Sequence, residues 1–345
     1  MEEQTKLHFP WAEGPVHGKC IQVAKGVLWF RLPLPMRLDH VNIYVLDDED
    51  GWTVIDTGFD TKKTRAIWLS MIGGPLAGKP IRRVVLTHHH PDHVGLAGWL
   101  QSEFGAELLT TRTAWLFARM LTLDIQEVPV AETLAFWRSA GMQTDIFDKR
   151  AVERPFNFGD VVAPMPLGFT RLQQGQTINM GGRTWDIHIG NGHAPEHATF
   201  WSRDDGLVIS GDQILSSISP NIGVYATEPM ADQIRDWLEA CERFSLLARA
   251  DQLVLGGHKL PFIGLPRRMG QLIDNHHGAL RRLIEYIESP KAASECFMPL
   301  FKRSIDDSEY GLALVESVAH LSHLYQTEVA TRTRRHDDAW VYQRK

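Results

Sequence analysis

The sequence predicts a layered α/β domain, assigned to residues 1–268, followed by a small helical domain at residues 269–345. Two observations support this division. In the first part, short β-branched or aromatic runs alternate with helix-like segments, and the same scheme repeats after the midpoint. From Met269 onward the apolar residues instead recur at helical spacing until Ser289 and Pro290 end the run.

Composition restricts the class of protein. The 345 residues are 43% hydrophobic and 23% charged, which is the balance of a globular protein with a sizeable core. No apolar run reaches membrane-spanning length, the N-terminal residues lack the layout of a signal peptide, and only three cysteines are present. We therefore expect a cytoplasmic protein without a disulfide framework. The formal charge of −6 gives no electrostatic reason for a polyanionic partner.

In the first half, apolar and β-branched runs predict strands, and a helix is expected at 61–72, before Gly73, Gly74 and Pro75. The predicted strands are Val27 to Leu32, Val41 to Leu46, Trp52 to Ile55 and Ile81 to Leu86. Another helix is expected at 94–104, and residues 113–150 are predicted to form a helical insert. Its aromatic residues either pack in the core or form a lid over a cleft.

The second half repeats the scheme with strands at 184–189, 207–210 and 253–255 and a helix near 232–248. Beyond residue 269, helices are expected at 269–287, 292–301 and 312–325, followed by an alternating tail at 339–342. Three helices and a small β element predict a compact domain of helical or winged-helix type.

The segment from Leu86 to His93 is the main candidate site. A six-residue window would hold roughly 0.3 histidines at the bulk frequency, whereas residues 88–93 hold four. The segment directly follows a buried strand, and open α/β sheets place their sites at the carboxyl ends of strands. His88 and His90 can point the same way from an extended chain, whereas His89 points to the other face. Imidazole and carboxylate side chains suit zinc, with iron or manganese as alternatives.

Three further ligand-type residues follow strands later in the chain. His193 comes after the strand that ends at Ile189, Asp212 follows Ser210 and Gly211, and His258 follows Gly256 and Gly257. Glycines at these places allow the backbone to approach a crowded site. Each of these patterns is weak alone, but the four together, in this order, predict a metal site.

These motifs resemble those of the metallo-β-lactamase-fold hydrolase superfamily, whose hallmark is His-x-His-x-Asp-His followed by separate His, Asp and His ligands. The resemblance covers about residues 25–265 and implies an αββα sandwich with two divalent metal ions at one edge. It assigns His88, His90 and His193 to one metal and Asp92, His93 and His258 to the other. Asp212 would bridge the two ions, and Asp92 and Asp212 are the expected catalytic carboxylates.

The resemblance also suggests supporting residues. Asp56, in the run Val-Ile-Asp-Thr-Gly, matches a family aspartate that lies beneath the metals and orients their ligands, although a strand-end cap would explain it too. His197 is expected to support the ligands rather than bind metal. Glu196 stands where the family often has glycine. Tyr225 either contacts substrate from a pocket wall or is a structural tyrosine.

The resemblance implies a dinuclear hydrolase in which a metal-bridging hydroxide attacks an ester, thioester, lactone or related carbonyl of a small molecule. A phosphodiesterase or ribonuclease of the same fold is the alternative. The C-terminal unit resembles the winged-helix-like domain of glyoxalase II-related and endoribonuclease-like members, so a DNA-binding regulator is a rival class. Its helix at 311–326 has no Lys or Arg, which argues against that class. The exact substrate, the native metal and the oligomeric state stay open.

Overall fold

The computed structural model describes residues 6–345 and divides into two compact units. The first unit comprises residues 6–125, Asn157–Pro220 and Leu247–Met269, and the second comprises Gln126–Phe156, Asn221–Leu246 and Gly270–Lys345. Helix α8 (Leu265–Tyr286) runs across the expected domain boundary, and the boundary after residue 268 stays a prediction. Among the described residues, no helix is both long and apolar enough to cross a bilayer.

The first unit contains a seven-stranded sheet whose strands follow one another in chain order. Strands β1 to β4 pair antiparallel, and β4 to β7 pair parallel. The bounds are β1 Ile21–Ala24, β2 Val27–Pro33, β3 His40–Asp48, β4 Gly51–Ile55, β5 Ile81–Val85, β6 Glu107–Thr110 and β7 Thr170–Arg171. The parallel strands β4 to β7 position the site, because the carboxyl ends of parallel strands lie at the same edge of the sheet.

A six-stranded sheet in the order β13-β12-β11-β10-β9-β8 completes the first unit. Only β11 and β12 pair parallel; the other neighbours are antiparallel. The bounds are β8 Thr177–Met180, β9 Arg183–Gly190, β10 His197–Ser202, β11 Leu207–Gly211, β12 Leu253–Gly256 and β13 Phe262–Ile263. One core cluster contains buried residues of both sheets, including Trp29 of β2 and Trp185 of β9, so the sheets pack face to face.

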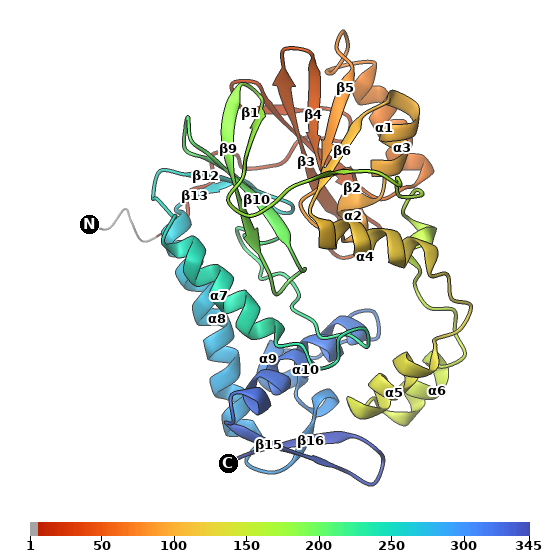
Figure 1. Cartoon of the computed structure of the whole chain (residues 1–345). Coiled ribbons are helices and arrows are strands. Elements are labelled where there is room, and N and C mark those ends of the chain that lie inside the picture. The colour runs from red at the N-terminus through yellow and green to blue at the C-terminus, as the bar shows by residue number, and fades with distance from the viewer. Residues whose placement is uncertain (1–5) are drawn as a thin grey trace. The chain divides into compact units, whose positions relative to one another are not determined.

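Helices cover the outer face of the seven-stranded sheet. They are α1 (Lys62–Ile72), the short α2 (Pro91–Val94) and α3 (Ala97–Phe104), and Figure 1 shows α1 and α3 against this sheet. The Thr61 hydroxyl accepts a hydrogen bond from the Thr64 amide at 3.1 Å, which caps the start of α1. The α/β layering predicted from the sequence is therefore present, whereas β6, β8 and β10 were not expected.

The expected insert at 113–150 consists of three helices instead of one continuous segment. Helix α4 (Arg112–Leu123) belongs to the first unit, whereas α5 (Ala131–Ser139) and α6 (Thr144–Arg150) belong to the second. The second unit also holds α7 (Gln233–Ser245), α9 (Phe297–Phe301), α10 (Tyr310–Gln326) and a sheet in the order β14-β16-β15. Its strands are β14 Lys291–Ala292, β15 Ala330–Arg334 and β16 Trp340–Arg344.

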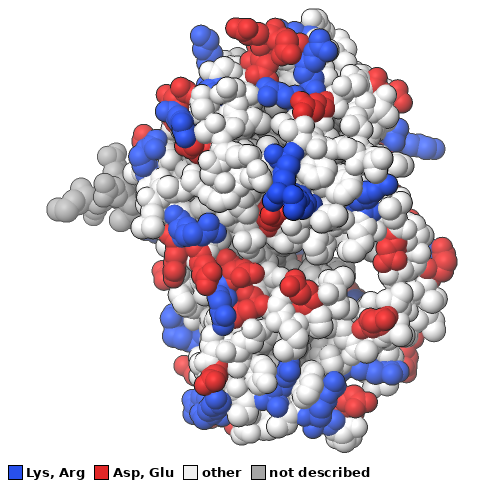
Figure 2. All heavy atoms as spheres, viewed as in Figure 1, with Lys and Arg blue, Asp and Glu red and all other residues white. Residues whose placement is uncertain are grey.

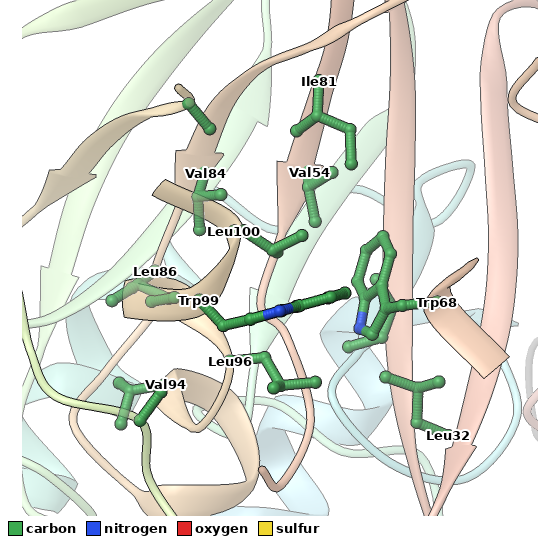
Figure 3. Packing of buried hydrophobic residues seen from close by; sticks show 14 of the residues in the cluster. Leu32, Val54, Trp68, Ile81, Val84, Leu86, Val94, Leu96, Trp99 and Leu100 are labelled. Atoms are coloured by element: carbon green, nitrogen blue, oxygen red, sulfur yellow. The ribbon is translucent and has the colours of Figure 1, made fainter. Parts of the chain in front are cut away.

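Trp68 connects this core to the edge of the sheet where the candidate site lies. Its ring is fully buried and lies beside Trp99 among aliphatic residues from the sheet and from α3 (Figure 3). Its indole N–H also donates a hydrogen bond of 2.9 Å to the Thr57 carbonyl, directly after Asp56. The helix α1 is thus fixed both to the core and to the segment that leaves β4.

We expect Trp68→Ala to lower the free energy of unfolding by about 3–5 kcal/mol, because it removes a buried ring and its hydrogen bond. The neighbouring Leu69 is 56% exposed, so Leu69→Ala is the matched control and should change stability by less than about 0.5 kcal/mol. Urea unfolding of both variants checks this. Similar losses in the two variants would contradict the assigned packing.

Candidate metal centre

The candidate ligands lie at the carboxyl ends of strands from both sheets. Asp56 follows β4, and the segment from His88 to His93 follows β5. His193 comes after β9, Asp212 after β11, and His258 after β12. Residues that are far apart in the sequence therefore meet where the two sheets expose their strand ends, as expected for open α/β sheets.

The histidine segment after β5 divides its side chains between two surroundings. His88 Nε2 and His90 Nδ1 lie 3.0 Å apart, so both rings converge on one place. The His89 ring instead lies against Phe117 and Phe158, with ring centroids 5.1 and 6.4 Å apart. His90 precedes helix α2, whose first residue is Pro91, and this turn carries Asp92 and His93 to the other side of the cluster.

The side chains form three overlapping groups of three residues. Within each group, the ligand atoms lie within 4.8 Å of one another. These groups are His88, His90 and His193; Asp92, His93 and His258; and His88, His93 and Asp212. Asp212 lies between the first two groups: its Oδ2 is 3.6 Å from His193 Nε2 and 3.1 Å from His258 Nε2. Its Oδ1 is 3.5 Å from His93 Nε2.

The protonation states of the cluster suit metal ligation. Burial and the neighbouring histidines hold the pKa values of His88 and His90 well below the ordinary value, so both imidazoles are neutral. His93 differs: burial alone would lower its pKa, but Asp92, Asp212 and Asp56 together raise it well above the ordinary value. The carboxylates therefore attract positive charge to this position, which a divalent cation would supply.

Two buried atoms of the cluster support the same conclusion. His93 Nε2 and Asp212 Oδ1 are shielded from solvent, and neither meets the geometry of a hydrogen bond with any described residue. Buried polar atoms in folded proteins are normally satisfied. A metal ion between the two groups would satisfy both atoms, and imidazole and carboxylate are suitable donors for zinc, iron or manganese. The residues present therefore fit a divalent metal site.

Asp56 contacts the cluster through Thr87 and His93. Its carboxylate accepts hydrogen bonds from the Thr87 amide and the Thr87 hydroxyl, both at 2.9 Å, and lies 2.8 Å from His93 Nδ1. Because His93 Nδ1 faces the carboxylate, it carries the proton, and Nε2 is presented to the cluster. Asp56 has a φ of 61°, a left-handed conformation that costs non-glycine residues about 1–3 kcal/mol.

His197 lies next to the predicted ligands but in none of the three groups. Its ring stacks on His88 with centroids 4.5 Å apart, and its Nε2 accepts a hydrogen bond from the Asp212 amide at 3.1 Å. Burial and nearby His193 lower the pKa of His197 to about 3, so the ring is neutral and Nε2 can accept. This geometry is consistent with the supporting role expected from the sequence.

Glu196 stands where the family often has glycine, and its backbone is left-handed, with a φ of 48°. Its amide donates to Asn191 Oδ1 at 2.9 Å, and its carboxylate accepts from the Thr113 amide at 2.7 Å, in the first turn of α4. A negative charge at a helix N-terminus is favourable. The loop that carries His193 thus keeps the conformation that glycine would adopt, and the glutamate is tied to α4.

Gly257 shows how closely the backbone approaches the cluster. A Cβ atom at this position would overlap Asp212 Oδ1 and would lie 2.7 Å from His93 Cε1. Any side chain here would therefore displace one of the candidate ligands. The glycine before His258 is required by the crowding of the site.

Three supporting residues of β3 were not found from the sequence. The His40 carbonyl accepts a hydrogen bond of 2.7 Å from His258 Nδ1, which presents His258 Nε2 to the cluster. Asn42 Nδ2 and the Tyr44 hydroxyl each donate to the Gly256 carbonyl at 2.9 Å. The sequence signal that could have found them is Asn42, a polar residue within the otherwise apolar run of β3. Tyr225 lies in the second unit and is 45% exposed, and its predicted role stays a prediction.

Comparison with known proteins identifies the family. Residues 36–258 match the model of the "Metallo-beta-lactamase superfamily", and residues 280–345 match that of the "Metallo-beta-lactamase-like, C-terminal domain". The chain belongs to the metallo-beta-lactamase superfamily. The sandwich fold and the C-terminal domain predicted from the sequence are therefore confirmed.

Individual relatives agree with this assignment. A Beta-lactamase domain protein from Burkholderia ambifaria is 32% identical, with a TM-score of 0.89 over 99% of this chain and 98% of that chain. The metallo-beta-lactamase family protein TTHA1429 from Thermus thermophilus is 25% identical, with a TM-score of 0.77 over 94% of this chain and 100% of that one. The Probable metallo-hydrolase YqjP of Bacillus subtilis (strain 168) is 25% identical over 89% of this chain and 94% of its own length. The protein is a metallo-hydrolase of this superfamily.

Asp212→Ala should reduce the bound metal per chain to less than half, because this carboxylate lies within reach of both sets of ligands. His89→Ala is the matched control: His89 is also buried, but it faces Phe117, so its loss should leave metal content unchanged. Elemental analysis after saturation with zinc measures both. Equal losses in the two variants would mean that the faces are assigned wrongly.

Proposed function

We propose that the protein is a dinuclear metal-dependent hydrolase that cleaves an ester, thioester, lactone or related carbonyl of a small molecule. The observation that carries this proposal is the position of Asp212 between the group of His88, His90 and His193 and the group of Asp92, His93 and His258. One carboxylate that reaches both groups suits a pair of cations with a shared ligand.

When bound, two divalent ions, proposed to be zinc with iron or manganese as alternatives, would supply an activated hydroxide and polarise the scissile carbonyl. The chain's own contribution is orientation. Asp56 and the His40 carbonyl fix the rings of His93 and His258 so that each Nε2 faces the cluster. The buried surroundings keep the imidazoles of His88 and His90 neutral.

Asp92 is proposed to combine ligation with proton transfer. Its Oδ2 faces the cluster, 3.3 Å from His258 Nε2 and 3.5 Å from His93 Nε2. Its side chain is 16% exposed, compared with 8% for Asp212, so it is the more accessible of the two carboxylates. Oδ1 of Asp92 is therefore the atom proposed to accept a proton from the attacking water and to pass it to the leaving group.

The surroundings of the ligands favour a carbonyl over a phosphodiester substrate. Residues 86–98, 189–200 and 210–227 contain no Lys or Arg, whereas nucleic acid substrates bring many negative charges. Elsewhere, acidic and basic side chains are interspersed over the face shown in Figure 2, without a continuous basic stripe on that face. A phosphodiesterase or ribonuclease is therefore the second candidate within the same fold.

The arginines of the C-terminal β hairpin contact residues of their own unit. Arg332 and Arg334 stack on the Trp340 ring at 4.3 and 4.0 Å, and Arg335 pairs with Asp337 at 2.9 Å. Helix α10 carries no Lys or Arg. Because this helix offers no cation to a phosphate backbone, a DNA-binding role is not proposed.

Metal content tests the dinuclear proposal. Protein prepared without chelator and saturated with zinc should approach two bound ions per chain, because the group of His88, His90 and His193 and the group of Asp92, His93 and His258 share no ligand. Elemental analysis against protein concentration measures this. A stable value of one ion under saturating zinc, iron and manganese would exclude a metal pair.

A substrate panel tests the reaction class. We expect hydrolysis of an aryl ester, a lactone or an acyl thioester, abolished by chelation and restored by added divalent metal. Bis(p-nitrophenyl) phosphate and RNA should be cleaved at least about 100-fold more slowly under the same conditions, because residues 86–98, 189–200 and 210–227 contain no Lys or Arg. The reverse order, with phosphodiester cleavage lost in Asp92→Ala, would assign the protein to the nuclease class.

A further inference from the structure

A cavity of about 410 Å³ lies within the second unit. Its walls come mainly from helix α5, residues 226–230, helix α10 and the C-terminal hairpin of β15 and β16. Every candidate metal ligand belongs to the first unit, and none of them lines this cavity. Small-molecule sites have volumes of about 300–1,000 Å³, so the cavity is large enough to be one.

One wall is a face of the hairpin that combines arginines with aromatic rings. Arg332 is paired with Tyr342, and Arg334 with Trp340, across β15 and β16. Alternate residues of a strand share one face, and all four side chains line the cavity. The two guanidinium carbons lie 4.3 and 4.0 Å from the centre of the Trp340 ring. Stacking uses the flat faces of the guanidinium groups and leaves the N–H donors at their edges available.

The Arg332 guanidinium has no acceptor among the residues that the structure describes. Besides the Trp340 ring it contacts the Tyr325 ring, at 4.5 Å, and neither contact uses an N–H donor. Arg334 donates to the Asp338 carbonyl and forms no ion pair in the described part of the chain. The hairpin therefore presents two cations to the cavity, and the N–H donors of Arg332 are unused.

The acidic groups around the hairpin do not neutralise these two arginines by direct contact. Asp337 and Glu295 both pair with Arg335, which is not a lining residue. Glu132 is the single carboxylate among the described residues that line the cavity, and it forms no ion pair within residues 6–345. Two guanidinium groups and one carboxylate give the lining a net charge of about +1, which suits a monoanion.

Two nearly buried hydroxyl groups of the lining are also unpaired. Tyr342 and Ser322 are each 3% exposed, and neither hydroxyl forms a hydrogen bond with any residue that the structure describes. Neither oxygen is sealed from solvent, so a molecule in the cavity can reach both. Buried hydroxyl groups normally have a partner. Together with Arg332, these hydroxyls offer donors to a carboxylate, which only accepts hydrogen bonds.

The rest of the lining is mainly apolar. Ala135 and Phe136 of α5, Val318 of α10 and Met230 contribute side chains, and Met230 is 56% exposed. A ligand that covers these side chains removes apolar surface from water. Methionine and phenylalanine also make favourable contacts with aromatic rings. The cavity therefore suits a carboxylate attached to an aromatic body better than a small inorganic anion.

We propose that this cavity binds a small aromatic carboxylate, with Arg332, Tyr342 and Ser322 binding the carboxylate and Met230 and Phe136 contacting the ring. The proposal goes beyond the hydrolase function proposed above and does not depend on it, because no candidate metal ligand takes part. The walls come from separate stretches of the second unit, so a bound anion would link them and stabilise this unit.

The binding test uses 2-naphthoate and its neutral counterpart 2-naphthamide, titrated calorimetrically into the full-length protein. We expect 2-naphthoate to bind roughly 10-fold more tightly than 2-naphthamide, or better, and to raise the thermal midpoint. Arg332→Gln removes the cation and should weaken 2-naphthoate binding by roughly 10-fold or more. Tyr342→Phe keeps the ring, loses only the hydroxyl, and should weaken binding by about 3-fold to 10-fold.

Arg344→Gln is the matched control for charge. Arg344 belongs to the same hairpin, but it pairs with Glu288 at 3.1 Å and is not a lining residue. This substitution removes the same charge from the same unit, and 2-naphthoate affinity should stay at the wild-type value. An equal loss in Arg332→Gln and Arg344→Gln would show a general effect of charge and would overturn the proposal.

A pair of substitutions on α5 tests where the ligand lies. Ala135 is exposed and lines the cavity, so Ala135→Trp should occupy the space and weaken 2-naphthoate binding by roughly 10-fold or more. Ala131 is also exposed and lies one turn earlier on the same helix, outside the lining. Ala131→Trp should therefore leave the affinity unchanged, and an equal loss in both variants would contradict the assigned position.

Two further outcomes would overturn the proposal. One is the absence of 2-naphthoate binding to the wild type at concentrations up to about 10 mM. The other is binding that neither Arg332→Gln nor Ala135→Trp weakens, as expected of 2-naphthoate bound at the metal centre. Thermal midpoints of the ligand-free variants are measured alongside. If Arg332→Gln lowers the midpoint by more than about 5 °C, Tyr342→Phe and Ala135→Trp decide the proposal instead.

Discussion

The carboxylate of Asp56 is the interaction on which the metal centre depends. It accepts two hydrogen bonds from Thr87 and faces His93 Nδ1, so it links the end of β4 to the histidine segment after β5. The left-handed backbone of Asp56 is what aims the carboxylate at that segment, and Trp68 holds the next residue through its carbonyl. The backbone strain at Asp56 is offset by the hydrogen bonds that orient the candidate ligands.

Charge sets a second constraint. Asp56, Asp92 and Asp212 lie close together in a largely buried region with three neutral imidazole rings nearby. Burial of charge without compensation is costly. Positive charge at His93 and His258 offsets part of this in the metal-free chain, where nearby carboxylates raise the pKa of His258 to about 10 against the effect of burial. Divalent ions would replace those protons, so metal affinity and proton release are coupled.

The convergence of the candidate ligands could be predicted because each of them lies shortly after an apolar strand, a pattern visible within a few positions. The strand β10 could not be predicted, because it is stabilised by pairing with β9 and β11, which are distant interactions that the local sequence does not reveal. The role of His40 was equally invisible, since it acts through its carbonyl oxygen, which every residue has. The two compact units are each assembled from three separate segments, which depends on contacts between distant parts of the chain.

The order of the ligands along the chain has a consequence for how the protein matures. The segment from His88 to His93 is synthesised early, whereas His193, Asp212 and His258 emerge much later. Asp212 and His258 come together only when β12 aligns in parallel with β11, a pairing that requires the whole of the intervening α7 region. A chain still on the ribosome therefore presents an isolated cluster of histidines with at most part of a coordination sphere. With the ligands proposed above, the metal centre is complete only after β12 has paired with β11.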